Sequence, residues 1–296
     1  MGRPGDGPGE LRTPMGLDMS ADGRIAVADT GNHRIQFFDS EGRFLSSIGE
    51  VAGFSFGRPM DVAFAVDGSL WVADFQHDAL YRITPRGDLV ERRTGDAAPA
   101  SPAGIAVLPD GRLAVTSFYD HALHLYTGEA HIRVGSEGTG PDGFHYPTGV
   151  SVGREGGLLV ADSYNHRLQL LDGDGRLEHS FRGAEGTPLR VPVAAAMTPG
   201  VVHVADSENH RVVAIDAQTG AELAEWRIVD AGSGAHTPSR IVSHGDRLYV
   251  TDSANHVVLV LARANPTSPR AFAPSGPMEV PHAEAKTRRE RSVSER

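Results

Sequence analysis

The chain contains no cysteine in its 296 residues and a single lysine, Lys286. Without cysteine it has no disulfide bond, no Cys-ligated zinc or iron–sulfur site and no thiol nucleophile. No apolar run approaches the roughly 18 residues of a membrane span, and the first twenty residues lack the apolar core of a signal peptide. We therefore expect a soluble cytoplasmic protein without membrane contact, unless a start upstream of residue 1 supplies a signal peptide.

The formal net charge is −10, which argues against a surface of clustered positive charge. Binding to a polyanion requires clustered basic side chains, so we expect no nucleic-acid partner. What the chain has is a 40% share of hydrophobic residues, together with 35 glycines and 19 prolines. This composition is typical of a globular fold with a sizeable core and many tight turns.

One nonapeptide, VADTGNHRI at residues 27–35, returns along the whole chain. The later copies read VADFQHDAL, VTSFYDHAL, VADSYNHRL, VADSENHRV and VTDSANHVV. Their third residues are the anchors of the repeat and lie 43 to 46 residues apart: Asp29, Asp74, Ser117, Asp162, Asp206 and Asp252. Repetition at this period indicates one array of equal units in place of the two domains that the length alone would allow.

Each unit reads as four short antiparallel strands, which we name A to D. A proline opens strand A, a turn follows, and strand B ends at the anchor. Period-two alternation, β-branched residues and turns rich in Gly, Asp and Asn support strands throughout. Four-stranded units repeated every ~40–50 residues are typical of the blades of a β-propeller, whose radial closure protects the strand edges.

The predicted fold class is therefore all-β, a six-bladed β-propeller over residues 1–275 followed by a disordered charged tail at 276–296. The repeats are expected at about 9–53, 54–96, 97–143, 144–186, 187–234 and 235–275. The first strand A follows a loop and not a complete strand D, so the way the ring closes is left open. The last blade either takes its strand D from residues 269–275 or remains three-stranded.

The segments at residues 14–49 and 147–183 resemble NHL repeats, which are named for an Asn-His-Leu-like motif. The likeness spans about residues 9–262. It is weaker in the second and third repeats, where QHD and YDH replace the Asn-His pair, and weakest in the sixth. This resemblance implies a six-bladed propeller that serves mainly as a binding platform. It also implies that a minority of relatives are enzymes.

An aspartate and a histidine recur a few residues apart, as Asp29 with His33 and Asp162 with His166. A carboxylate and an imidazole within reach of each other suit general acid–base catalysis. An active site needs one such pair, however, whereas this pair recurs in several blades with the same Asn and Arg. We interpret these residues as structural, capping turn amides and pairing charges, and predict no catalytic residue.

Alternation along strand A directs a set of small residues toward the propeller axis, where the inner strands crowd together. Three charged residues interrupt this set: Asp18, Asp61 and Arg240. A buried charge is costly unless it is paired. Either Asp18 and Arg240 form an ion pair that closes the ring between blades six and one, or the charged residues bind a polar ligand at the channel mouth.

The turns between strands B and C and the crossovers from strand D to the next strand A lie on one face of such a propeller. The variable residues of these loops therefore share a surface, and we predict ligand-binding residues there: His77, Tyr119, His145 and Tyr164. Their variable neighbours in the same loops are Arg58, Phe75, Gln76, Asp78, Phe118, Asp120 and Tyr146. Loops on a rigid scaffold often carry recognition, and aromatic side chains suit it.

Six-bladed enzymes provide the alternative. Resemblance to peptidyl-hydroxyglycine amidating lyase would place zinc-binding histidines directly after the prolines of strand A, where this chain has Met15, Met60, Ala103, Thr148, Val193 and Ser239. A gluconolactonase-type site would bind one divalent cation through Asp18 and Asp61, but Arg240 opposes a cation there.

We therefore expect no metal and no cofactor. The sequence predicts a noncatalytic, monomeric binding propeller that recognises a protein, a peptide or a small polar ligand. The alternative is a metal-dependent hydrolase or lyase that uses the central channel.

Overall fold

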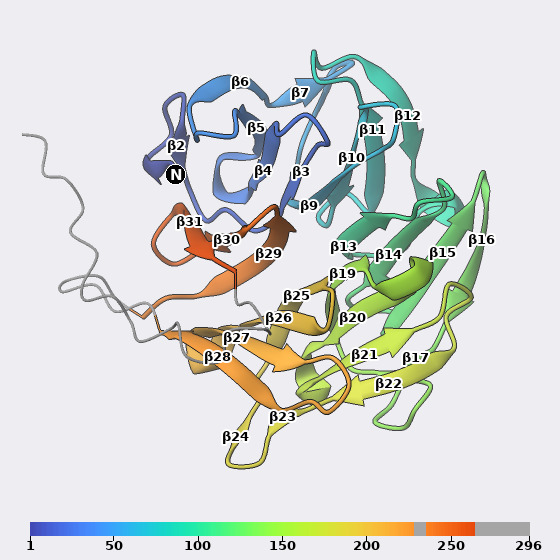
Figure 1. Cartoon of the computed structure of the whole chain (residues 1–296). Helices are drawn as coiled ribbons and strands as arrows, with labels where there is room; N and C mark the ends of the chain where they lie inside the picture. The colour runs from blue at the N-terminus through green and yellow to red at the C-terminus, as the bar shows by residue number, and fades with distance from the viewer. Residues whose placement is uncertain (228–234, 264–296) are drawn as a thin grey trace, which may run out of the picture.

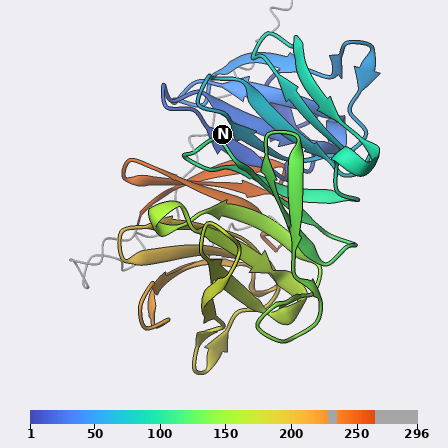
Figure 2. The same cartoon turned by 90° about the vertical axis from the view of Figure 1, so that its right-hand side faces the viewer.

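The computed structural model describes residues 1–227 and 235–263, which form six blade sheets arranged in a ring (Figures 1 and 2). Five blades are 4-stranded sheets and the last is a 3-stranded sheet, all antiparallel between neighbours. Within these ranges no helix has the length and hydropathy of a membrane span. The all-β, six-bladed propeller predicted from the repeats is confirmed.

In each blade the strands run in chain order from the axis outward. Blade one comprises β3 (Leu17–Met19), β4 (Ile25–Asp29), β5 (Arg34–Phe38) and β6 (Phe44–Ile48). Blade two comprises β9 (Pro59–Phe64), β10 (Leu70–Asp74), β11 (Ala79–Ile83) and β12 (Leu89–Arg93). Blade three comprises β13 (Pro102–Val107), β14 (Leu113–Ser117), β15 (Ala122–Thr127) and β16 (Ala130–Val134).

The other half of the ring follows the same plan. Blade four comprises β19 (Pro147–Val152), β20 (Leu158–Asp162), β21 (Arg167–Leu171) and β22 (Leu177–Phe181). Blade five comprises β25 (Pro192–Thr198), β26 (Val201–Asp206), β27 (Arg211–Asp216) and β28 (Glu222–Arg227). Blade six comprises β29 (Pro238–His244), β30 (Arg247–Asp252) and β31 (Val257–Ala262).

Short elements that the repeat pattern did not predict stiffen the loops. Two-stranded ribbons lie in the loops before blades one, two, four and five: β1 (Arg3–Pro4) with β2 (Glu10–Leu11), β7 (Glu50–Val51) with β8 (Phe54–Ser55), β17 (Ser136–Glu137) with β18 (Gly143–Phe144), and β23 (Gly183–Ala184) with β24 (Thr187–Pro188). Single 3-10 turns lie at η1 (Thr30–Asn32), η2 (Gly95–Ala97), η3 (Arg154–Gly156), η4 (Ser163–Asn165) and η5 (Ser207–Asn209). Three of these, η1, η4 and η5, are B–C turns, so the face they form has a defined backbone.

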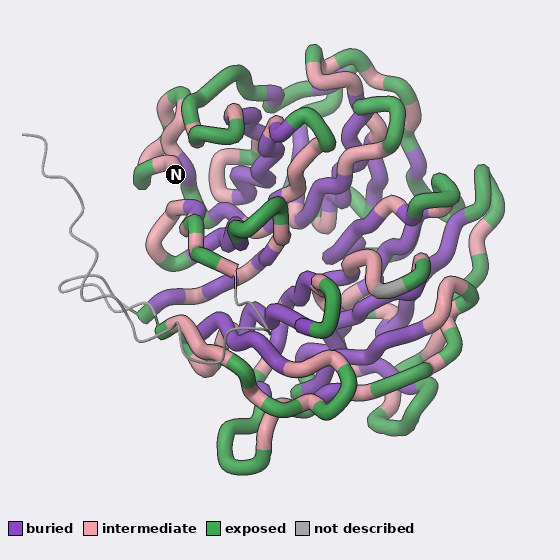
Figure 3. The backbone as a smooth tube through the Cα atoms, in the orientation of Figure 1, coloured by how far each residue is buried: buried purple, intermediate pink, exposed green. Residues whose placement is uncertain are grey.

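The core is divided among the blade interfaces. Each pair of neighbouring blades shares its own apolar cluster, as Val27 of blade one does with Tyr249 of blade six. Strand B is buried at every position in blades one to five, because both of its faces pack against a neighbouring blade. Figure 3 shows this as purple inner strands surrounded by pink and green outer strands and turns. Burial of apolar surface, which contributes about 25 cal/mol per Å², therefore stabilises the contacts between neighbouring blades as well as the packing within each blade.

The ring closes between blades six and one through backbone and side-chain contacts. The backbone of Met1 exchanges two hydrogen bonds with Val258 of β31, at 2.5 and 2.8 Å. The Thr251 hydroxyl donates to the carbonyl of Met15 (2.7 Å), which ties strand B of blade six to strand A of blade one. Met1 therefore lies beside β31 on its rim side. The strand expected at 269–275 and the tail at 276–296 lie outside the described residues.

Candidate functional site

Asp162 shows what the repeated anchor residue does. It is fully buried and accepts hydrogen bonds from the backbone N–H of His145 (2.7 Å), from Nδ2 of Asn165 (2.9 Å) and from Nε of Arg167 (2.7 Å). Asp29 binds a backbone N–H, an Asn and an Arg at the corresponding positions of blade one. Each such anchor ties the D–A crossover of its blade to the B–C turn, as the structural interpretation of the motif requires.

The histidine of the motif links one blade to the next. It occupies a left-handed backbone conformation with φ near +50°, as does the residue that replaces it in blade two: His33, Asp78, His121, His166, His210 and His256. Nδ1 of His121 accepts a hydrogen bond from the backbone N–H of Tyr146 in the following crossover (3.0 Å). In blade two Asp78 accepts from the backbone N–H of Ser101 (2.6 Å) in the same way. The repeat pattern gave no signal for this linkage, because periodicity does not tell which neighbour a side chain reaches.

An aromatic surface lies on the face of the B–C turns and D–A crossovers of blades two to four. We call it the aromatic patch, and its members are Phe75, Phe118, Tyr119, His121, His145, Tyr146 and Tyr164. Phe118 lies at its centre, with its ring centroid 4.7 Å from that of Tyr146 and 5.2 Å from that of Tyr119. The side chains nevertheless face solvent in part, since Tyr119 is 62% exposed and Tyr164 is 49% exposed.

The patch draws its side chains from several positions of the repeat. Blades three and four place Tyr119 and Tyr164 two residues after their anchors, where the other blades have Gly, Gln, Glu or Ala. Tyr146 directly precedes the proline of strand A and has a φ of +49°, a strained conformation that the bond to His121 holds. The guanidinium of Arg58 lies 5.4 Å from the ring centre of Phe75, at the blade-two end of the patch. The structure thus brings three of the predicted residues, Tyr119, His145 and Tyr164, into one surface.

His77 belongs to the scaffold of blade two. It occupies the position of the motif Asn, and its Nδ1 lies 3.1 Å from Oδ2 of Asp74. Its ring also covers Gly57, where a Cβ atom would lie 2.8 Å from the imidazole. Its contacts therefore place it beside the anchor rather than within the aromatic patch.

The inner strands approach one another closely at the level of the third residue of strand A. A Cβ atom on Gly104 would lie 2.3 Å from the carbonyl oxygen of Thr148 in the next blade, so only glycine fits there. Gly16 occupies this level in blade one, between Asp61 of blade two and Arg240 of blade six. Because Gly16 has no side chain, the side chains of Asp61 and Arg240 can come into contact across it.

Arg240 forms its ion pair with Asp61. Its Nε lies 3.3 Å from Oδ1 of Asp61, and its Nη1 donates to the carbonyl of Val150 at 3.0 Å. Oδ2 of Asp61 accepts from the backbone N–H of Ile105 (3.0 Å). Burial raises the pKa of Asp61 to about 6, against the attraction of the Arg240 guanidinium, which lowers it.

The predicted ion pair between Asp18 and Arg240 is therefore wrong. Asp18 lies two residues further along strand A than the level of Arg240, and its Oδ2 accepts from the backbone N–H of Phe64 (2.8 Å). Burial raises the pKa of Asp18, while Arg240 acts on it through its charge without direct contact. The alternation of residues in strand A correctly predicted that these side chains point toward the propeller axis. It did not predict at which level along the axis each of them lies.

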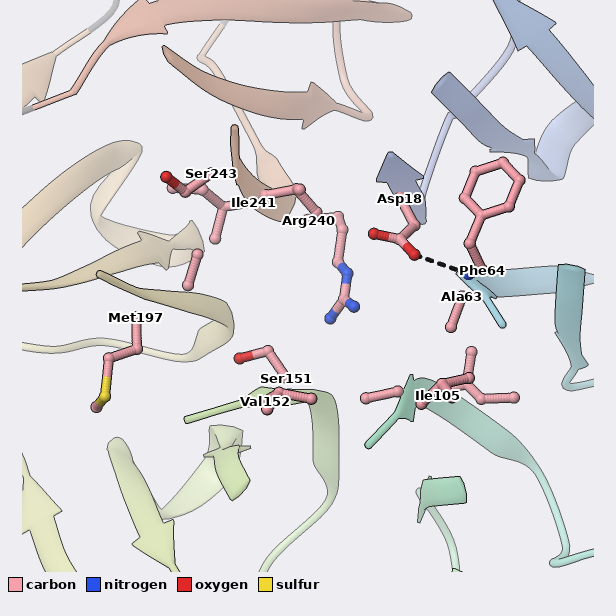
Figure 4. Close-up of a pocket in the computed structure, with 14 residues that line it drawn as sticks. Asp18, Ala63, Phe64, Ile105, Ser151, Val152, Met197, Arg240, Ile241 and Ser243 are labelled. Atoms are coloured by element: carbon pink, nitrogen blue, oxygen red, sulfur yellow. Dashed lines mark hydrogen bonds between the residues drawn. The ribbon is translucent and has the colours of Figure 1, made fainter. Parts of the chain in front are cut away.

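A cavity of about 220 Å³ occupies the half of the channel near the A–B turns (Figure 4). Asp18 and the guanidinium of Arg240 point into it, together with the hydroxyl-bearing side chain of Ser151. The remaining wall is largely apolar: Ala63, Phe64, Ile105, Ala106, Val107, Val152, Ala196, Met197, Ile241 and Val242, with Ser243 at one side. None of the aromatic-patch residues lines this cavity, so Asp18 and Arg240 do not share a cavity with the aromatic patch.

Family models match the chain in two places. The NHL repeat model matches residues 11–38, and the model described as outer membrane protein assembly factor BamB matches residues 63–287. The chain is an NHL-repeat propeller. The longer match covers more than half of the chain, so the chain belongs to the family of that model.

Several curated proteins are similar to parts of this NHL-repeat propeller. Human E3 ubiquitin-protein ligase TRIM32 is 30% identical over 139 residues, which make up 43% of this chain and 21% of TRIM32. The Drosophila melanogaster protein brain tumor is 52% identical over 42 residues, or 14% of this chain and 4% of that protein. Mouse NHL-repeat-containing protein 4 is 29% identical over 116 residues, or 39% of this chain and 83% of that protein. The chain thus spans about a fifth or less of the length of TRIM32 and brain tumor.

Solved structures are similar in fold. A streptogramin B lyase aligns with a TM-score of 0.63 at 15% identity, over 86% of this chain and 84% of the lyase. A chain of a nidogen/laminin complex aligns with a TM-score of 0.61 at 18% identity, over 74% of this chain and 81% of that chain. At such identities the likeness describes the propeller fold and says nothing about activity.

Proposed function

We propose that this NHL-repeat propeller is a noncatalytic binding platform that recognises a segment of a partner protein on its aromatic patch. The observation that carries the proposal is the contact of five Phe and Tyr side chains from three blades, with Tyr119 and Tyr164 left substantially exposed. Large exposed aromatic side chains held on a rigid scaffold are typical of the residues that dominate binding energy at protein interfaces.

The loops beneath the patch support a preorganised surface. The anchor Asp162 fixes the B–C turn of blade four, and the bond from Tyr146 to His121 fixes the crossover above it. A binding surface whose backbone is already ordered loses less conformational entropy when the partner arrives. The ordered backbone of these loops therefore favours binding of a partner to the patch without a rearrangement of the loops.

The chemistry of the patch favours a peptide with an apolar or aromatic anchor. The rings of Phe118 and Tyr146 offer apolar surface, and the phenol groups of Tyr119 and Tyr164 offer hydrogen bonds at its edge. Arg58 adds a cation beside Phe75. Human TRIM32 is named as an E3 ubiquitin-protein ligase, and similarity to it supports a protein as the class of partner.

A selection experiment tests the proposal. A random peptide library displayed on phage is selected against the wild-type protein, with counter-selection against a Tyr119→Ala/Tyr164→Ala variant. A selected synthetic peptide is expected to bind the double variant at least tenfold more weakly, as measured by fluorescence anisotropy. Glu208→Ala is the matched control, because Glu208 occupies in blade five the position of Tyr164 in blade four.

Two results would overturn the proposal. Equal Kd values for the wild type and for a double variant of unchanged melting temperature would mean that the peptides bind elsewhere. Metal-dependent turnover of a lactone or a hydroxyglycine peptide by the wild type would favour the alternative of an enzyme that uses the channel.

A further inference from the structure

We propose that the channel cavity near the A–B turns is a separate binding site for a small organic cation, a protonated amine with an apolar body, and that Asp18 is its anchor. The site does not depend on the aromatic patch, because none of the patch residues lines this cavity. A small molecule bound here would leave the opposite face free for a protein partner.

The shape and the wall of the cavity fit a small amphipathic molecule. Its volume of about 220 Å³ is below the usual range for drug-sized ligands, so it suits a compact ring or a short aliphatic chain. The apolar wall includes Ile105, Val152 and Met197, which can cover a hydrocarbon body. The polar side chains of the lining are those of Asp18, Arg240, Ser151 and Ser243, which lie at different places around the cavity (Figure 4).

The charges around the cavity are unbalanced. Two carboxylates, Asp18 and Asp61, face one guanidinium, and Arg240 lies within ion-pair distance of Asp61 only. Arg240 is 6% exposed and has its Nη1 bound to the carbonyl of Val150. Asp18 therefore has a backbone N–H as its hydrogen-bond donor but no ion-pair partner among the residues that the structure describes. A half-buried carboxylate in this position is stabilised by an added cation.

Two polar atoms at the same place are buried without a hydrogen bond. They are Nε of Arg240 and Oδ1 of Asp61, which face each other at 3.3 Å. Groups of this kind are uncommon in folded proteins and indicate a missing partner or a strained pair.

A divalent metal ion fits the site less well than an amine. Ca²⁺ takes six to eight oxygen ligands, whereas the cavity offers the Asp18 carboxylate and few other oxygens. The Ser151 hydroxyl already donates to the carbonyl of Ala195 (2.7 Å). The guanidinium of Arg240 would repel a double positive charge more strongly than a single one. An ammonium group needs only a few acceptors and brings its own apolar body.

The experiment compares three probes of nearly equal shape at pH 7.5, using the full chain. Benzylamine, benzyl alcohol and benzoate are titrated by calorimetry, and the melting temperature is followed in parallel. We expect benzylamine to bind at least tenfold more tightly than benzyl alcohol and to raise the melting temperature. Benzoate is expected to bind most weakly, because its carboxylate would be repelled by the carboxylate of Asp18 in the cavity wall.

Three variants assign the site. Asp18→Asn keeps an acceptor for the Phe64 N–H and is expected to weaken benzylamine binding at least tenfold. Ala196→Leu fills the cavity from its wall and is expected to weaken both benzylamine and benzyl alcohol. Asp110→Asn is the matched control, because Asp110 lies exposed on an A–B turn of blade three, outside the cavity lining.

Several outcomes would overturn the inference. Benzoate binding that is tightest and is lost in Arg240→Met would make the cavity an anion site. A rise in melting temperature with Ca²⁺ or Zn²⁺ alone that Asp18→Asn abolishes would make it a metal site. Equal binding of benzylamine to a folded Asp18→Asn variant, or no binding of any probe to the wild type, would remove the site as proposed. If Asp18→Asn does not fold, an unchanged affinity of Ala196→Leu for benzylamine would overturn the proposal in its place.

Discussion

The B–C turns of blades two to four and those of blades five, six and one share a scaffold but expose different chemistry. In both halves a buried anchor binds a crossover N–H, as Asp162 does in blade four and Asp206 in blade five. Two residues after these anchors stand Tyr164 and Glu208. The comparison teaches that the repeated residues maintain the ring, whereas residues that depart from the repeat give one half of the face the aromatic surface that we propose binds a partner.

The first prediction tests whether the scaffold is equal in both halves. Asp162→Ala is expected to lower the free energy of unfolding by about 3–5 kcal/mol, because it leaves a buried arginine without its carboxylate. Asp206→Ala is expected to cost less than this but clearly more than an exposed site, because the arginine of blade five keeps its contacts with Glu222 and Glu225. Those arginines are Arg167 and Arg211, both almost fully buried. Denaturant-induced unfolding measures the effect.

The control for this pair is Asp174→Ala, an exposed carboxylate in a C–D turn, whose cost should stay within about 0.5 kcal/mol. A cost for Asp206→Ala close to that of the control would show that the two halves are not built alike.

The second prediction separates the channel from the face. Arg240→Met leaves Asp61 buried without its ion-pair partner and is expected to cost about 3 kcal/mol at pH 8. The folded-state pKa of Asp61 is about 6, above the 3.8 of the unfolded chain, and loss of Arg240 raises it further. Protonation of Asp61 then favours the folded state. The deficit, meaning the difference in the free energy of unfolding between the wild type and Arg240→Met, should therefore shrink as the pH falls from 8 toward 5.

Chemical unfolding at several pH values measures this deficit, with Arg247→Met as an exposed control in the same blade. Binding of a selected peptide to the aromatic patch should be unchanged in Arg240→Met. A deficit that is constant with pH would contradict the assignment of Asp61 as the partner.

The third prediction uses one buried histidine in each half, His124 in blade three and His203 in blade five. Burial lowers the pKa of each to about 4, below the 6.5 of the unfolded chain. Each neutral ring therefore contributes stability above pH 6.5 that is lost as the pH falls from 6.5 toward 4.

His203→Gln and His124→Gln should reduce the loss of stability between pH 7 and pH 5 by about 1–2 kcal/mol each. Thermal unfolding across this range measures it. The same slope in wild type and variants would show that these histidines do not titrate with folding.

Much of the fold could be predicted from the sequence because the anchors mark each blade. The position of Asp29 and its five equivalents fixed the number of blades and the face on which Tyr119 and Tyr164 lie. Alternation in strand A also placed Asp18, Asp61 and Arg240 on the channel side. These features depend on residues that are close together in the sequence, so the pattern within each repeat is enough to predict them.

The remaining features depend on distances across the ring. Arg240 meets Asp61 instead of Asp18 because the levels of blades six and two match and Gly16 between them is small, which no single repeat encodes. The contact of Met1 with Val258 joins residues 257 positions apart. The cavity near the A–B turns follows from small side chains contributed by several blades, such as Ala63 and Ala196.

Site-specific photo-cross-linking tests the central claim most directly. A benzoylphenylalanine replaces either Gln76 or Glu208, which are exposed and hold the same position of the B–C turn in blades two and five. We predict that a peptide selected on the wild type cross-links from position 76, beside the aromatic patch, and at most at background level from position 208. Equal cross-linking from both positions, or cross-linking from position 208 alone, would contradict the account.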